Sequence, residues 1–142
     1  MRLSLMMVFM LFAFLASSQK TENYTPEEKV VEKATTFGMT FEKRHIELGK
    51  VKRGEKRETE FIFKNTGTED IVIEIVSACE CTSLDWPSRV KPGETGRIGV
   101  VFDSTEKEAS ETIEIDINLQ NREKDTGYKR LEIISYSFEL IP

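Results

Sequence analysis

The chain has 142 residues, of which 39% are hydrophobic, and its 25 Asp and Glu outweigh 20 Lys and Arg to give a net charge of −5. This acidic balance, without a basic stripe interleaved with aromatic residues, argues against nucleic acid as a partner. It also argues against docking on an anionic membrane surface. The chain beyond its first segment is long enough to bury one core as a single domain.

Residues 1–18 have the pattern of a secretory signal peptide. Arg2 supplies a positive charge, an apolar run extends over residues 3–16, and small residues follow through Ser18 at a spacing that a signal peptidase accepts. The run is shorter than the roughly 20 residues that a transmembrane helix needs. We therefore expect cleavage near Ser18, export to the periplasm or outside the cell, and no stable membrane insertion of the mature protein.

Residues 19–37 are polar and charged and are expected to form a leader between the signal and the domain. Within them, Thr25, Pro26 and Glu28 have the arrangement of a helix start, as N-cap, first helical residue and capping-box partner. A short helix through Ala34 would bury little apolar surface, so a solvated spacer is the preferred interpretation.

Residues 38–142 alternate apolar with polar side chains, which is the period of β-strands, and no segment after Phe37 has a helical period. We expect about seven short strands with one apolar face each, which are buried most economically as two packed antiparallel sheets. The predicted fold is an all-β, immunoglobulin-like β-sandwich, with a small closed barrel as the alternative. The side chains expected to face inward are those of Ile46, Leu48, Thr59, Phe61, Phe63, Ile71, Ile73, Ile75, Ile98, Val100, Phe102, Ile113, Ile115, Ile117 and Leu119.

Turn residues separate these strands. Asn65 and Gly67 tolerate positive φ and predict one turn, and Pro92 with Gly93 predicts another. In the last strand the alternation changes phase at residues 133–134, which predicts a bulge there.

Both cysteines lie one residue apart, as Cys79 and Cys81 in the stretch VSACECTSLDWP. If the strand that contains Ile71, Ile73 and Ile75 continues in phase, both thiols face the core, where cysteine behaves as a small apolar residue. This is the preferred interpretation. A disulfide is the first alternative, because export favours oxidation. Two strand steps span about 6.6 Å, near the upper limit of Cα separation for a bridge, and the loop would be too small to add much stability.

Two further alternatives use the cysteines chemically. Two thiolates on one face would bind copper(I) or supply two of the four ligands of zinc, and a reducible disulfide would be a redox-sensitive element. A thiol enzyme is disfavoured, because Glu80 and Asp85 oppose thiolate formation.

No catalytic constellation is evident elsewhere in the sequence. His45 is the only histidine and is expected to be an exposed strand residue. No serine lies in a G-x-S-x-G setting, and the carboxylates alternate with apolar residues on predicted solvated faces. We therefore predict that the protein is not an enzyme and has no resident cofactor, unless the cysteines hold copper or zinc.

The stretch from Ile46 to Ser104 also resembles the bacterial secreted domain-of-unknown-function family 1573. The family pattern runs G-x-[IV]-x-x-G-E, F-x-F-x-N-T-G, an alternating apolar strand, C-G-C-T, Pro-Gly-Glu and F-[DN]-S. The matching positions are Gly49, Val51, Gly54, Glu55, Phe61, Phe63, Asn65, Thr66, Gly67, Cys79, Cys81, Thr82, Pro92, Gly93, Glu94, Gly96, Phe102, Asp103 and Ser104. Where the family usually has glycine between the cysteines, this chain has Glu80.

The resemblance implies an immunoglobulin-like sandwich, similar to the sperm-protein-like and centrosomal-flagellar domains, and export from a bacterium. It implies no activity, because the family has none assigned.

Two hypotheses of function follow. The first is an exported, non-enzymatic module that binds or scaffolds an unidentified protein through an exposed strand edge or the end that carries Thr82, Trp86 and Pro87. A lid over the core is the preferred structural interpretation of Trp86. The alternative hypothesis is a thiol redox or soft-metal protein that uses Cys79 and Cys81.

Overall fold

The computed structural model describes residues 35–142, so the predicted signal peptide and the predicted leader up to residue 34 lie outside the described residues. The described part of the chain contains strands and loops and no α-helix, hence no helix able to cross a membrane.

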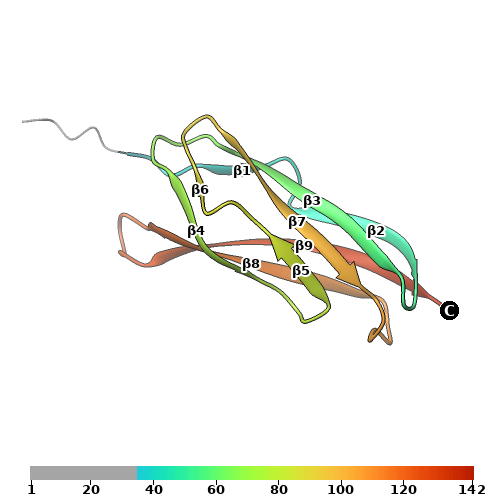
Figure 1. Ribbon diagram of the computed structural model, residues 1–142. Coiled ribbons are helices and arrows are strands. Elements are labelled where there is room, and N and C mark those ends of the chain that lie inside the picture. Colours follow the sequence, from blue (N-terminus) through green and yellow to red (C-terminus); the bar gives the residue numbers. More distant parts are fainter. Residues whose placement is uncertain (1–34) are drawn as a thin grey trace, which may run out of the picture. The chain divides into compact units, whose positions relative to one another are not determined.

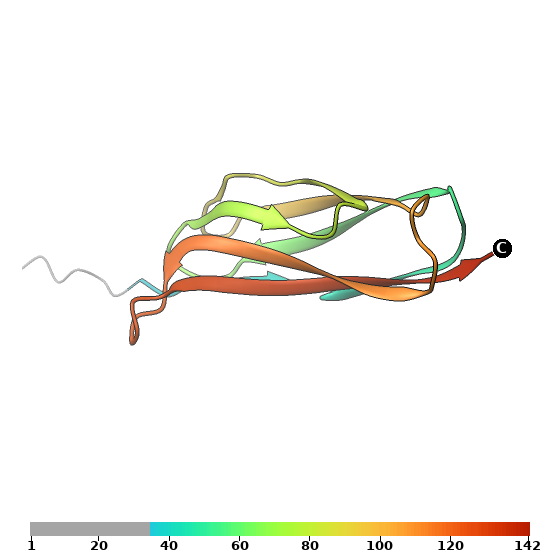
Figure 2. The ribbon, with the colours of Figure 1, turned by 90° about the horizontal axis from the view of Figure 1, so that it is seen from below.

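Nine strands form two sheets that face each other as two layers (Figures 1 and 2). They are β1 (Met39–Phe41), β2 (His45–Lys52), β3 (Lys56–Asn65), β4 (Ile71–Ser77), β5 (Thr82–Asp85), β6 (Arg89–Val90), β7 (Thr95–Asp103), β8 (Glu111–Arg122) and β9 (Lys129–Ile141). One sheet has the order β1-β3-β7-β5 and the other β2-β9-β8-β4-β6. The predicted all-β sandwich is therefore confirmed, and the short strands β5 and β6 after the cysteines contribute to a strand number above the expected one.

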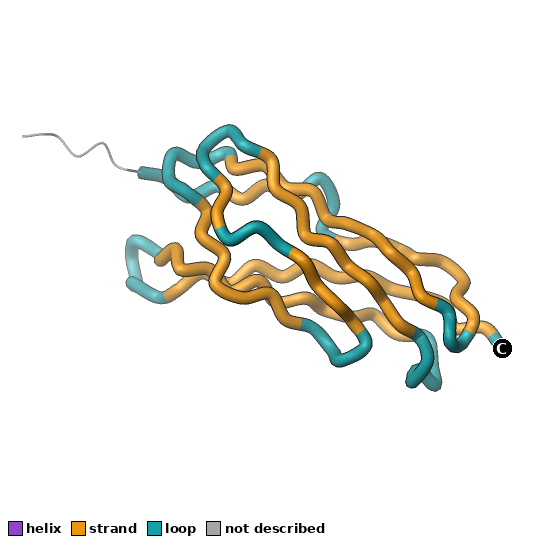
Figure 3. The backbone as a smooth tube through the Cα atoms, viewed as in Figure 1, coloured by secondary structure: helices purple, strands orange, loops and turns teal. Residues whose placement is uncertain are grey.

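The core lies between the sheets and contains most of the predicted inward residues. Phe102 is fully buried there, and its ring centroid lies 5.4 Å from that of Tyr136 and 4.4 Å from that of Phe138. Loops and turns gather at the two ends of the strands (Figure 3). The buried apolar side chains are Met39, Val51, Phe61, Phe63, Ile71, Ile73, Val76, Val90, Ile98, Val100, Phe102, Ile113, Ile115, Ile117, Leu119, Ile134, Tyr136 and Phe138.

Strand β4 departs from the predicted inward row. Its register against β8 shifts between Ile73 and Ile75, and Val76 takes the buried position while Ile75 is 50% exposed. A bulge turns every later side chain to the opposite face, so the expectation for Ile75 is wrong. The same shift leaves Ser77 exposed and removes the basis for placing the cysteines on a continuous inward row.

The predicted bulge at residues 133–134 is also wrong. Strand β9 alternates regularly, with Ile134 buried and Ile133 45% exposed, and its pairing with β8 is continuous from Leu131 to Phe138. The register shift lies instead between Asn118 and Arg122 of β8. The two adjacent isoleucines therefore face opposite sides of the sheet.

The structure places Pro92 and Gly93 in a turn, where Gly93 has a φ of 81° and the Glu94 N–H donates to the Lys91 carbonyl at 3.0 Å. Positive φ at the third residue is the geometry that favours glycine in a type II turn.

Asn65 and Gly67 play different parts from those expected. Asn65 is the last residue of β3 and is buried. Gly67 is not at positive φ, but a Cβ there would lie less than 3 Å from Gly38 N and from the Thr36 carbonyl oxygen. Glycine is needed because the segment before β1 passes close by, so the expected role of positive φ is wrong.

Candidate functional site

The cysteine turn lies between β4 and β5 and is closed by a disulfide between Cys79 and Cys81. The chain bends here, since the two Cα atoms are 5.2 Å apart, closer than the roughly 6.6 Å of two strand steps. The preferred interpretation of two free core thiols is therefore wrong about their bonding. Both residues are nevertheless half-buried and pack against the core.

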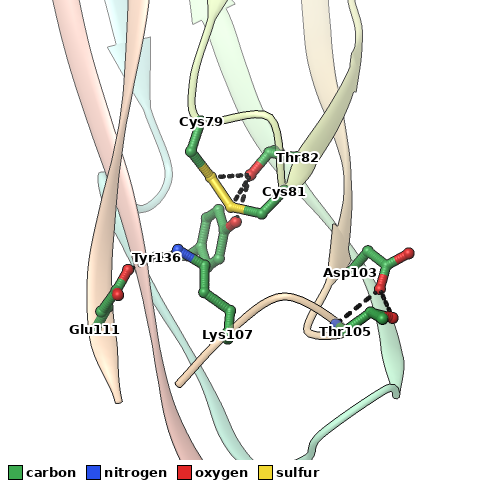
Figure 4. Close-up of a disulfide and its surroundings, with 8 residues drawn as sticks. All are labelled: Cys79, Cys81, Thr82, Asp103, Thr105, Lys107, Glu111 and Tyr136. Carbon is green, nitrogen blue, oxygen red and sulfur yellow. Dashed lines mark hydrogen bonds and ion pairs between the residues drawn. A yellow bond between two sulfur atoms is a disulfide. The ribbon is translucent and has the colours of Figure 1, made fainter. Parts of the chain in front are cut away.

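A hydroxyl pair adjoins the disulfide (Figure 4). The Thr82 Oγ1 atom lies 2.5 Å from the Tyr136 hydroxyl, 3.4 Å from Cys79 Sγ and 3.6 Å from Cys81 Sγ. The backbone fixes the turn as well, because the Thr82 N–H donates to the Cys79 carbonyl at 3.0 Å and the Asp103 N–H to the Cys81 carbonyl at 2.9 Å. The turn is thereby attached to both sheets.

Burial raises the pKa of Tyr136 above its ordinary value of 10.0, the bond with Thr82 opposes this, and the Glu111 carboxylate adds to it. Because the folded state holds this proton more tightly than the unfolded state, stability from it is fully present below about pH 10 and is lost as pH rises further. We expect the wild-type urea midpoint to fall more steeply above pH 10 than that of Tyr136→Phe. Parallel profiles of the two proteins would contradict this assignment.

The disulfide closes a very small loop, with a sequence separation of 2. Chain entropy then predicts that it adds only about 1.5 kcal/mol to the free energy of unfolding. We expect the double variant Cys79→Ser, Cys81→Ser to keep its fold and to lose about this amount in urea unfolding. Loss of the folded state would show instead that the bridge is essential to the domain.

Metal-ligand geometry is not found in residues 35–142, where no group of three or more His, Cys, Asp or Glu is placed to hold an ion. His45 is exposed at the start of β2, as expected, and its Nδ1 and Nε2 atoms lie 2.8 and 3.0 Å from the hydroxyls of Ser135 and Ser137.

The aromatic residue of the predicted partner surface is only partly accessible. Trp86 is half-buried and packs against the core, and Pro87 beside it is half-buried too. Next to them an open hollow of about 530 Å³ lies over Gly99 on the outer face of the four-stranded sheet. Its rim is charged, because Arg97 forms ion pairs with Glu60 at 3.4 Å and Asp85 at 3.6 Å. This face of the domain therefore offers an interface candidate without an exposed apolar anchor.

A second surface, made of exposed apolar side chains, was not predicted from the sequence. The exposed large apolar side chains of the described residues are Ile75, Tyr128, Leu131 and Ile133, which are 50%, 74%, 51% and 45% exposed. Asn118 of β8 pairs with both Ile75 of β4 and Leu131 of β9, so these strands carry the side chains on the outer face of the five-stranded sheet. Tyr128 immediately precedes β9. We call these four residues the β9 edge surface.

The β9 edge surface adjoins an uncovered strand edge. Strand β2 pairs with β9 only from Ser135 onward, so among the described residues Leu131 and Ile133 have a strand partner on the β8 side alone. The Ser135 N–H donates to the Arg44 carbonyl at 2.9 Å, and the Ile133 carbonyl accepts from the Arg44 guanidinium at 3.3 Å, both away from β8. By the alternation of a ladder, the N–H and C=O of Leu131 and the N–H of Ile133 also point to the open side.

The signal that could have found this surface is the pair of adjacent isoleucines at 133 and 134. We interpreted it as a bulge because every large apolar residue was assigned to the core. The structure shows instead a regular strand with one isoleucine on each face, Ile134 buried and Ile133 exposed.

Solved structures with the same architecture are distant in sequence. The chain is 16% identical to a protein of unknown function from Porphyromonas gingivalis W83, with a TM-score of 0.58, covering 75% of this chain and 47% of that one. The ASH / PapD-like domain of human CEP192 is 13% identical, with a TM-score of 0.57, covering 72% and 84%. The VesB protease of Vibrio cholerae is 11% identical, with a TM-score of 0.56, covering 72% and 31%.

These likenesses show the fold alone. The chain spans about a third of the VesB protease chain and about half of the Porphyromonas chain. No curated protein sequence matches it. A family model described as a protein of unknown function, DUF1573, matches residues 39–132.

Proposed function

This chain belongs to the DUF1573 family of proteins of unknown function, and we propose that it is an exported, non-enzymatic module that binds another protein at the β9 edge surface. The observation that carries the proposal is the coincidence of exposed apolar side chains with a strand edge that has no partner strand within residues 35–142, at Leu131 and Ile133. Exposed strand edges are recurrent sites for strand addition, in which backbone bonds give affinity and side-chain contacts give specificity.

The occupant that fits is an extended segment of a partner protein with apolar residues at alternate positions. Its backbone would bond to the N–H and C=O of Leu131 and to the N–H of Ile133. Its outward side chains would cover Leu131 and Ile133, each still about half exposed. Covering the exposed half of each side chain would stabilise the complex by about 1 kcal/mol per residue.

The charges around the surface disfavour an acidic occupant. Lys129 is paired with Glu74 at 2.6 Å, and Arg44 with Glu132 at 2.7 Å. These charged groups are therefore already paired within the domain, whereas the Asp116 carboxylate, opposite Ile133 on β8, has no ion-pair partner among the described residues. An acidic residue on the incoming strand would lose hydration without gaining a free counter-charge.

Export is supported by the signal-like residues 1–18 and by the Cys79–Cys81 disulfide, since structural disulfides persist in oxidising compartments. The mature protein is expected to begin near Gln19, which an intact mass of material from an exporting cell would establish. An uncleaved N-terminus would contradict this part of the proposal.

The redox alternative has one specific observation in its favour, the disulfide beside the Thr82 hydroxyl. Copper or zinc would need that bond to be reduced first, because thiolates are the ligands that these metals take from cysteine.

Site-specific photo-crosslinking in the exporting cell tests the proposal. Benzoylphenylalanine at position 131 is expected to give a discrete adduct, and the same adduct should disappear when Ile133→Lys is added. Benzoylphenylalanine at position 64 is the control, because Lys64 is exposed on β3 in the other sheet. Identical adducts from both positions, or none from position 131, would overturn the docking surface.

A further inference from the structure

The Thr82 hydroxyl lies within hydrogen-bonding distance of both sulfur atoms of the disulfide, at 3.4 Å from Cys79 Sγ and 3.6 Å from Cys81 Sγ. Its position is fixed by the buried Tyr136 hydroxyl 2.5 Å away (Figure 4). The Thr82 hydroxyl thus contacts the two sulfurs and the tyrosine together.

The hydrogen-bond partners of the Tyr136 and Thr82 hydroxyls indicate where each hydroxyl proton points. Within residues 35–142, the Tyr136 hydroxyl has one hydrogen-bond partner, Thr82 Oγ1, and burial keeps the tyrosine protonated by raising its pKa. If Tyr136 donates to Thr82, the Thr82 proton is directed to a sulfur atom. A disulfide sulfur is a weak acceptor, whereas a thiolate is a charged and stronger one. The pair of hydroxyls therefore favours the thiolate that forms when the disulfide opens.

We propose that the turn formed by Cys79, Glu80, Cys81 and Thr82 is a thiol–disulfide exchange site, in which Tyr136 and Thr82 stabilise the departing thiolate. Thr82 and Tyr136 are positioning residues in this account. The proposal is independent of the docking surface on β9.

The co-reactant is a dithiol. One of its thiolates attacks either sulfur of the disulfide, the S–S bond breaks, and the electron pair leaves on the other sulfur, which accepts the Thr82 hydrogen bond. The second thiol of the reductant, as its thiolate, then attacks the reductant's sulfur in the mixed disulfide, so that this S–S bond breaks and the attacked cysteine leaves as a thiolate. The reductant leaves as a disulfide, two electrons have passed to the domain, and two protons convert the cysteines to thiols.

The charged side chains around the turn do not take the place of Thr82 in stabilising the departing thiolate. The Asp103 carboxylate accepts from the hydroxyl and N–H of Thr105 at 2.6 and 3.0 Å. The Lys107 ammonium is paired with Glu111 at 2.7 Å. Glu80 is exposed at the centre of the turn. The Thr82 hydroxyl is therefore the polar group in direct contact with both sulfurs.

Reduction of the folded protein by dithiothreitol tests the proposal, followed by alkylation and mass measurement over a range of pH. Wild type is expected to open without denaturant, and Thr82→Val to exchange about tenfold more slowly, the loss expected for one hydrogen bond to a charged group. Thr82→Ser keeps the hydroxyl and should restore most of the rate.

Alkylation of the reduced protein distinguishes stabilisation of the thiolate from a purely structural role of Thr82 and Tyr136. Thr82→Val and Tyr136→Phe should both move the iodoacetamide pH profile of the reduced protein to higher pH, an effect that lowered fold stability alone would not produce. Urea midpoints of all variants serve as the folding control. Exchange of Thr82→Val within twofold of wild type, unchanged alkylation profiles, or a disulfide that opens only in denaturant would each overturn the proposal.

Discussion

Replacing Asn65 with alanine is expected to lower the free energy of unfolding by about 3 kcal/mol or more. Asn65 is only 1% exposed. Its amide nitrogen donates to the carbonyls of Glu69 and Val90 at 2.8 and 2.9 Å, and its side-chain oxygen accepts from Gly67 N–H at 3.0 Å. Alanine would leave these three backbone groups without their partner, at a cost of about 1–3 kcal/mol for each group that water cannot reach.

Urea unfolding of Asn65→Ala measures this effect. Asn118→Ala is the matched control, since Asn118 is half-buried in the middle of β8 and faces outward. We expect the control to change the free energy of unfolding by about 0.5 kcal/mol or less. Similar losses in the two variants would mean that the buried amide does not organise the turn between β3 and β4.

The double variant Leu131→Lys, Ile133→Lys is expected to weaken partner binding by at least about 30-fold, the loss typical of an interface hot spot. Both side chains are about half exposed in the free domain, so unfolding should change by only about 0.5 kcal/mol. Lysine on a strand edge also opposes pairing with another strand. The partner recovered at position 131, titrated against the purified domain, gives the affinity.

Glu114→Lys is the control for charge. Glu114 is exposed on β8 of the same sheet, and its replacement changes the net charge by the same amount as the double variant. Binding by Glu114→Lys should stay within about twofold of wild type, because a rim charge contributes little to affinity. Equal losses in both proteins would assign the effect to net charge and not to the apolar contact.

The alternation of apolar residues was sufficient to predict the sandwich. The rows at Ile98, Val100 and Phe102 and from Ile113 to Leu119 are buried as expected, because a strand with one apolar face has only one economical way to bury it. The short strands β5 and β6 carry too few residues for a period to be detected.

The candidate site was predictable only in part. The spacing of Cys79 and Cys81 was sufficient to single them out as a pair. Whether they are bonded depends on how the chain bends after the bulge in β4. The contact of Thr82 with Tyr136 joins residues 54 positions apart, and no local pattern encodes it. Ile75 and Ile133 were misplaced for a common reason, the assumption that a large apolar side chain must be inside, although folded proteins always expose some apolar surface.

Amide hydrogen exchange at Leu131 and Ile133 tests the central claim most directly. The partner segment recovered at position 131 would be synthesised as a peptide and added to the isotopically labelled domain. Strand addition predicts at least about tenfold slower exchange at Leu131 and Ile133, with little change at Glu132, whose N–H already faces β8. Unchanged exchange at Leu131 and Ile133, with protection appearing between Ser83 and Trp86 instead, would contradict the account and place binding beside the four-stranded sheet.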